Sequence, residues 1–324
     1  MLNVLLVGAG RMGLRHLRGI AREASAISVV YHRQDIDADV RQILAECDYE
    51  GTVNVVPSIE LAADRGGKFD AAILSATAAG RQERFADVLA LDIAHILLEK
   101  PLEQSRAAVL EMQALARRRN SDIRCNNVFR EQPVFDHFRM AAPPFQMTVN
   151  AGAIGLACGG IHWIDLACFL SGDGSGQLIS GTLEPRPIAS GRGQQFRDFG
   201  GYGLFQFEDG SNLFIRVAAD SSAPAVCVIT QQHRQLVIDN LGGVLLHQRT
   251  DNADQPNYLY GQGYETRQAR EFFDIDLPVQ TRLWLQHVKG QRSSKLPRLT
   301  DAARSHQLLF DLLQTDGGEN FPIT

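Results

Sequence analysis

The motif Gly8-Ala9-Gly10-Arg11-Met12-Gly13 is the feature that most limits what this chain can fold into. It follows directly on Leu2–Val7, a short apolar run typical of a strand buried on both faces of a parallel sheet. It leads into residues 12–24, where apolar side chains recur at helical spacing. In this context the first glycine permits a tight turn, the second lets the backbone approach a pyrophosphate, and the third allows close helix–strand packing. Because amides at the start of a helix attract phosphate, the sequence predicts a dinucleotide-binding turn made by Gly8, Gly10, Arg11, Met12 and Gly13.

The first 125 residues alternate between strand-like and helix-like segments. The apolar runs that follow the first one are Ile27–Tyr31, Val53–Val56, Ala71–Ala76 and His95–Leu98. Helical patterns separate them, and such a succession indicates a doubly wound parallel sheet with right-handed crossovers. We therefore expect an α/β fold that begins with an NAD(P)-binding Rossmann domain over residues 1–125.

After Arg130 the pattern changes to long alternating segments with few helices between them. Asp209-Gly210 joins two of these segments and predicts a hairpin. We expect residues 126–324 to form a second domain, for substrate binding and oligomerisation, with a last helix over 302–313 near the domain junction. The polar and glycine- or proline-containing stretches Arg186–Gly201 and Thr250–Gly263 are predicted to be loops.

The composition excludes several classes of protein. A chain of 324 residues exceeds what one hydrophobic core usually supports, which favours two domains. The net charge of −5 lacks the basic excess of nucleic-acid-binding proteins. No apolar run approaches the ~20 residues of a membrane span, and the first strand begins at Leu2, so we expect neither a membrane partner nor a signal peptide. The 5 cysteines are scattered and odd in number, which is typical of reduced thiols in a cytoplasmic protein.

The end of the predicted second strand bears on the choice between NAD and NADP. It reads Tyr31-His32-Arg33-Gln34, where NAD-binding turns usually carry a carboxylate for the ribose 2′-hydroxyl. An arginine can pair bidentately with the 2′-phosphate of NADP, so Arg33 favours NADP slightly. Asp35 or Asp37 reaching the ribose would instead favour NAD. The further predicted cofactor contacts are His32, Thr77, Glu99 and Lys100.

Glu99-Lys100-Pro101 directly follows the predicted strand His95–Leu98. Open α/β sheets bind their ligands at the carboxyl ends of the strands, so Lys100 is expected near the reacting ring of the cofactor. Its ammonium can hold a substrate hydroxyl and stabilise the negative charge that develops on it. Taken alone, the tripeptide favours a surface ion pair between Lys100 and Glu99, and the catalytic reading depends on the motifs around it.

The order of several motifs resembles the glucose–fructose oxidoreductase, inositol dehydrogenase and MocA (Gfo/Idh/MocA) family. The segments that carry this resemblance are Gly8–Gly13, Ala71–Thr77, Leu97–Leu102, Asn127–Arg130, Gly160–Leu166 and Tyr202–Leu213. The resemblance implies a Rossmann domain followed by a domain with a large, mostly antiparallel open sheet. It also implies NAD(P)-dependent hydride transfer at a sugar, cyclitol or sugar-nucleotide hydroxyl or ketone, in a homodimer or homotetramer formed through the C-terminal sheet.

The same resemblance assigns His162 as the general base on the substrate hydroxyl, a role that suits an imidazole near neutral pH. Asp165 lies three residues further on the predicted helix Ile161–Leu170 and shares a face with it. The family usually has an aspartate four residues before this histidine, whereas this chain has Cys158. A thiol cannot orient an imidazole as a carboxylate does.

Three interpretations of Cys158 stay open: catalysis by His162 and Lys100 alone, a changed substrate or reaction direction, or a cofactor-binding sensor or scaffold with weak turnover. Cys158 and His162 lack the additional ligands of a zinc site, so no metal is expected. We expect Arg130, Cys158 and Trp163 among the substrate contacts.

Overall fold

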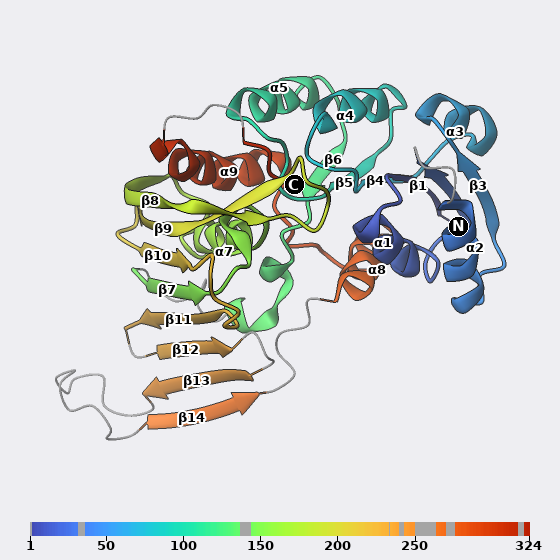
Figure 1. Ribbon diagram of the computed structural model, residues 1–324. Coiled ribbons are helices and arrows are strands. Elements are labelled where there is room, and N and C mark those ends of the chain that lie inside the picture. Colours follow the sequence, from blue (N-terminus) through green and yellow to red (C-terminus); the bar gives the residue numbers. More distant parts are fainter. Residues whose placement is uncertain are drawn as a thin grey trace. The chain divides into compact units, whose positions relative to one another are not determined.

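A parallel sheet with strand order β3-β2-β1-β4-β5-β6 underlies the N-terminal part of the computed structural model (Figure 1). Its strands are β1 (Asn3–Val7), β2 (Ala26–Val30), β3 (Thr52–Val56), β4 (Ala71–Leu74), β5 (His95–Leu98) and β6 (Asp122–Cys125). The helices between them are α1 (Arg11–Ile20), α2 (Ile36–Glu46), α3 (Ile59–Gly66), α4 (Arg81–Ala90) and α5 (Arg106–Ala116). The strand order reverses between β1 and β4, the position at which such sheets bind their ligands. The predicted α/β class is confirmed.

The structure describes residues 2–31, 36–136, 144–232, 234–239, 243–249, 264–269, 276–316 and 321–324. The chain divides into two compact units, the first comprising Met1–Glu131, Ile275–His306 and Glu319–Thr324, the second Gln132–Asp274 and Gln307–Gly318. The sequence analysis placed all residues after 125 in the second domain, but residues 275–306 pack with the first unit.

Helix α8 (Leu277–Val288) explains why this late segment returns to the first unit. Trp284 and Leu285 are buried in the same apolar cluster as Leu6 of β1 and Val29 of β2. A Cβ on Gly19 of α1 would lie 2.5 Å from a carbonyl oxygen of α8, so the glycine allows the two helices to pack closely. Helix α9 (Leu299–Leu313) begins in the first unit and ends in the second, because the division follows His306.

The second unit contains a mixed sheet of the order β14-β13-β12-β11-β7-β10-β9-β8. Its strands are β7 (Gln146–Ala151), β8 (Gly176–Ala189), β9 (Arg197–Phe207), β10 (Asn212–Val217), β11 (Val226–Gln231), β12 (Arg234–Asp239), β13 (Gly243–Arg249) and β14 (Tyr264–Ala269). Only β7 and β10 pair in parallel, so the sheet is mostly antiparallel as expected. The predicted Asp-Gly hairpin joins β9 to β10.

One predicted loop is wrong in extent. Residues 186–189 and 197–201 lie in β8 and β9, which pair with each other through two register shifts, so the loop contains only residues 190–196. Backbone pairing therefore outweighs the glycine-, proline- and arginine-rich composition that predicted a loop. The other predicted loop, Thr250–Gly263, lies outside the described residues.

None of the helices within the described ranges combines the length and the apolar character needed to cross a membrane.

The remaining helical elements are η1 (Val128–Glu131), η2 (Pro133–Phe135), the π-helical η3 (Gly155–Gly160), α7 (Ile161–Leu170) and η4 (Gln314–Asp316).

Candidate functional site

The glycine motif forms the turn that its spacing predicts. Gly8 has a φ of +96°, and a Cβ there would lie 2.5 Å from the backbone nitrogen of Ala76. A Cβ on Gly13 would lie 1.9 Å from the carbonyl oxygen of Gly8, so only glycine allows α1 to begin this close to β1. At Gly10, the N-cap of α1, a Cβ would meet nothing within 4 Å. Backbone atoms therefore pack tightly against Gly8 and Gly13, whereas the space beside Gly10 is open. This arrangement fits a pyrophosphate that approaches the N-terminus of α1.

Glu99, the residue before Lys100, is held in the protein interior. Its side chain is 3% exposed, and its carboxylate accepts hydrogen bonds from His16 Nε2 at 3.0 Å and Asn126 Nδ2 at 2.5 Å. Burial acts to raise the pKa of Glu99, but these hydrogen bonds and the charges of His16 and Lys100 outweigh it and hold the pKa well below its usual range. Glu99 is therefore ionised, and its carboxylate lies in the interior and not at the surface.

His16 of α1 connects this carboxylate to α8, and its hydrogen bonds fix its protonation. The hydroxyl of Thr281 donates to the carbonyl oxygen of Leu277 at 2.7 Å, so its oxygen accepts from His16 Nδ1 at 2.8 Å. The ionised Glu99 can only accept, so His16 Nε2 also donates. With both ring nitrogens donating, His16 is an imidazolium in a buried ion pair. This pair ties the helix that starts at the glycine turn to the residue beside Lys100.

Arg81, the first residue of α4, also holds the turn that contains Lys100. It is fully buried, and its guanidinium donates to the carbonyl oxygens of Glu99, Pro101 and, at 2.5 Å, Ala76. Ala76 is the residue against which Gly8 packs, so one arginine joins the turn at Lys100 to the loop beside the glycine turn. The Lys100–Pro101 peptide bond is cis.

His306 of α9 completes the support of this segment. Its Nδ1 donates to the carbonyl oxygen of Ala302 at 2.6 Å, so its Nε2 is free of a proton and accepts from the backbone nitrogen of Leu102 at 2.9 Å. Burial lowers the pKa of His306 to about 4, and the charges of Arg81 and Lys100 act in the same direction. His306 is therefore a neutral acceptor, next to the cationic Arg81 and Lys100.

Sequence reasoning did not find His16, Arg81 or His306 as parts of a site. Each is a single polar residue within a helical pattern, with no motif around it. Their partners in this network lie 83, 20 and 204 residues away, respectively. The one signal in the sequence was a polar or charged residue at a helix position where the apolar periodicity predicts a buried side chain.

In the second unit, Asp198 of β9 organises the segment that leads to His162. Its carboxylate accepts from the backbone nitrogens of Ala157 at 2.9 Å, Cys158 at 2.7 Å and Phe199 at 2.8 Å. These bonds hold the π-helical turn η3, which continues directly into α7. Sequence reasoning missed Asp198 because it lies inside the stretch read as a loop. Its carboxylate holds the backbone at Cys158, the position at which the family usually has an aspartate side chain.

The remaining predicted site residues differ in accessibility. His162 and Cys158 are half-buried, whereas Asp165 and Trp163 are buried among the apolar residues of α7. Arg130 is also buried, in η1. Along the first unit, Arg11 is exposed and Met12, Thr77 and Lys100 are half-buried. His32 and Arg33 lie outside the described residues.

The glycine turn lies in a segment that matches a known family model. Residues 2–127, less than half of the chain, match the Gfo/Idh/MocA model of an oxidoreductase family with an NAD-binding Rossmann fold. The predicted resemblance to this family of NAD(P)-dependent oxidoreductases is confirmed over these residues. Among curated proteins, none matches the sequence.

Solved structures extend the likeness to nearly the whole length of the chain. UDP-N-acetylglucosamine 3-dehydrogenase GnnA from Acidithiobacillus ferrooxidans aligns with a TM-score of 0.70 and 15% identity over 97% of this chain and 96% of that one. An oxidoreductase from Agrobacterium radiobacter in complex with NAD+, L-tartaric acid and magnesium aligns with a TM-score of 0.71 and 13% identity over 97% and 96%. A mutant of the 3-ketoreductase KijD10 from Actinomadura kijaniata, in complex with TDP-benzene and NADP, aligns with a TM-score of 0.67 and 16% identity over 97% of each chain. At these identities the likeness shows the shared fold.

Proposed function

We propose that this protein is an oxidoreductase that transfers hydride between a nicotinamide dinucleotide and a hydroxyl or ketone of a carbohydrate-type substrate: a sugar, a cyclitol or a sugar nucleotide. The main support for the proposal is that hydrogen bonds of Arg81 link the turn at Lys100 to the residues beside the glycine turn. Arg81 bonds the backbone on both sides of Lys100 and the carbonyl oxygen of Ala76, against which Gly8 packs. A lysine held so firmly next to a phosphate-binding turn is suited to a reaction at the bound cofactor.

Lys100 is assigned the role of holding the substrate oxygen. The lysine ammonium donates to that oxygen and stabilises the negative charge that it gains when its proton leaves. His162 is assigned the proton transfer, as base in oxidation and as acid in reduction. Gly8, Gly10 and Gly13 are assigned to the pyrophosphate, and the nicotinamide, when bound, accepts or supplies the hydride.

The substrate class is supported by the names of the similar structures, which include a sugar-nucleotide dehydrogenase and a ketoreductase with a TDP ligand. The cofactor preference is supported only by the sequence. Arg33 favours NADP slightly, and the similar structures include complexes with NAD and with NADP. Titration of the protein with both reduced cofactors tests this preference, and an equal or tighter affinity for NADH would reject it.

The main experiment replaces Lys100 with methionine, which keeps most of the length of the side chain and removes its charge. Turnover in a screen of sugars, cyclitols and sugar nucleotides should fall at least ~100-fold, because the substrate oxygen loses the ammonium that holds it and stabilises its negative charge. Cofactor affinity, measured by fluorescence titration, should stay unchanged. Lys68→Met, at an exposed lysine of the same unit, is the matched control and should retain full turnover. Unchanged turnover in Lys100→Met would remove the assigned role.

Cys158 favours a second candidate function, a cofactor-binding sensor or scaffold with little turnover. In this alternative the half-buried thiol replaces the carboxylate that would orient the histidine. Cys158→Asp discriminates between the two functions. A large gain in turnover over a nearly inactive parent would support the sensor, whereas an active parent that gains little would support the enzyme.

A further inference from the structure

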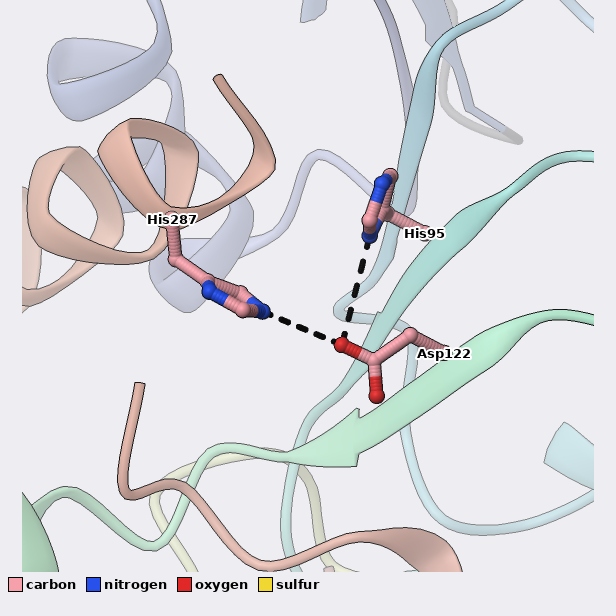
Figure 2. A group of neighbouring side chains, drawn as sticks. All are labelled: His95, Asp122 and His287. Carbon is pink, nitrogen blue, oxygen red and sulfur yellow. Dashed lines mark hydrogen bonds and ion pairs between the residues drawn. The ribbon is translucent and has the colours of Figure 1, made fainter. Parts of the chain in front are cut away.

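His95, Asp122 and His287 form a group of donor side chains at the edge of the first unit's sheet that lies opposite the glycine turn. His95 and Asp122 are the first residues of β5 and β6, whereas Lys100 follows the other end of β5. His287 comes from α8, and its ring and that of His95 both face one carboxylate oxygen of Asp122 (Figure 2). The three potential ligand atoms lie within 4.8 Å of one another.

The hydrogen bonds of His287 show that the group needs a cation. Its Nδ1 lies 3.2 Å from the carbonyl oxygen of Arg292, which can only accept, so Nδ1 carries a proton. Its Nε2 lies 3.1 Å from Oδ2 of Asp122. Arg124 Nε donates to the same oxygen at 2.9 Å, so Oδ2 of Asp122 is an acceptor. Two lone pairs would face each other between Nε2 and the carboxylate unless a proton or a metal ion lies between them.

His95 provides the third donor. Its Nδ1 is buried, has no hydrogen-bond partner among the described residues, and lies 4.0 Å from Oδ2 of Asp122. The rings of His95 and His287 meet edge to face with centroids 6.1 Å apart.

We propose that His95 Nδ1, His287 Nε2 and Asp122 Oδ2 bind a divalent transition-metal ion of the zinc class. Two ligands of a tetrahedral zinc ion, each ~2 Å from it, are separated by roughly 3.3 Å. His287 Nε2 and Asp122 Oδ2, 3.1 Å apart, are close to this separation, and His95 Nδ1 lies 4.0 Å from the same oxygen. Two imidazoles and one carboxylate select zinc, cobalt or nickel over magnesium and calcium, which prefer oxygen ligands.

The surroundings of the three donors match those of metal ligands in two respects. The carbonyl of Arg292 accepts the distal N–H of His287 and fixes its ring, as second partners of metal-binding histidines do. Arg124 Nε donates to the same carboxylate oxygen at 2.9 Å, which orients Asp122 but also places a positive charge close to the ion. We therefore expect weaker binding than at a closed structural zinc site.

The site is accessible from solvent and adjoins a cavity. The side chains of His95, Asp122 and His287 are 29%, 24% and 19% exposed. His95 and Asp122 also line a cavity of about 590 Å³, together with Arg117, Arg298 and Thr300. An ion held by three protein ligands keeps a fourth position for water or a small ligand, and the two arginines make this cavity suited to an anion.

The test is a Co²⁺ titration of the full-length, chelator-treated protein, followed by visible absorption, with Zn²⁺ competition measured by calorimetry. We expect one ion per chain, intense absorption bands of a four-coordinate site, and no binding of Mg²⁺. His95→Gln is the main variant, because His95 Nδ1 has no hydrogen-bond partner among the described residues, and it should weaken Co²⁺ affinity at least ~10-fold. Asp92→Asn, at an exposed acid that pairs with Arg119, is the matched control and should bind as the parent does.

Three results would overturn the proposal: no Co²⁺ binding below millimolar concentration, equal affinity in His95→Gln, or Mg²⁺ binding as tight as Co²⁺ binding. The first would show that a proton alone bridges His287 and Asp122. The second would place the ion at other residues. Circular dichroism of each variant shows whether it is folded, and His287→Gln provides a second test at the opposite donor.

Discussion

His306 is expected to make the protein less stable in mild acid, and the size of the effect follows from its surroundings. Its ring is fully buried, and burial lowers its pKa to about 4. In an unfolded chain the pKa of a histidine is ~6.5. Between these values the unfolded state binds the proton and the folded state does not, so the free energy of unfolding falls as the pH falls from about 6.5 towards 4.

The expected magnitude comes from the two pKa values. At pH 5 the unfolded histidine is almost fully protonated and the folded one is not, a difference of ~1.5 pK units or about 2 kcal/mol relative to pH 7.5. His306→Gln removes the titration, because an amide has no proton to gain in this range. A glutamine oxygen can accept from the nitrogen of Leu102, and its NH₂ group can donate to Ala302 as the imidazole does.

The assay is urea unfolding of the parent and of His306→Gln at pH 7.5 and pH 5, followed by tryptophan fluorescence. The parent should lose about 2 kcal/mol more than the variant between the two pH values. Subtracting one pH difference from the other removes the contributions of all other titrating groups. Equal pH dependence in both proteins would refute the reasoning, since it would show that the folded and unfolded states protonate His306 alike.

The turn and the two supporting carboxylates give three further predictions. Gly13→Ala places a Cβ 1.9 Å from the carbonyl oxygen of Gly8 and should abolish dinucleotide binding in a fluorescence titration; parental affinity would exclude the turn as the binding element. Glu99→Gln leaves the His16 imidazolium without its counter-charge and should lower the free energy of unfolding by about 3 kcal/mol, and a loss below about 1 kcal/mol would contradict the ion pair. Asp198→Asn leaves one backbone N–H without an acceptor and should cost about 1–3 kcal/mol in the same urea assay; unchanged stability would show that the carboxylate is dispensable.

The fold was predictable where one local rule applied to one segment. The glycine motif and the apolar runs predicted the parallel sheet, and β5 and α7 have the predicted bounds His95–Leu98 and Ile161–Leu170. Prediction failed where distant segments decide the outcome. Residues 186–189 and 197–201 become strand because each pairs with the other. Residues 275–306 join the first unit because Trp284 completes its core, which no local pattern indicates.

The role of Lys100 stays a prediction, made from its place directly after a strand, whereas the groups that hold its turn could not be predicted from the sequence. Its supports are buried polar side chains from three helices, namely His16, Arg81 and His306. Because polar residues on amphipathic helices usually face solvent, the sequence predicts that these three side chains are exposed. Their burial becomes clear only when their hydrogen-bond partners are known.

The unexpected burial of these polar side chains has a consequence for function. Burying a charge is costly even when it is paired, and an apolar replacement of a buried ion pair is often neutral or stabilising. The first unit nevertheless buries the His16–Glu99 pair and the guanidinium of Arg81 around a single turn. Stability alone does not explain such an arrangement, whereas the need to fix one ammonium relative to the glycine turn does. Places where a sequence departs from the usual rules of burial are often functional sites, and here the departures gather around Lys100.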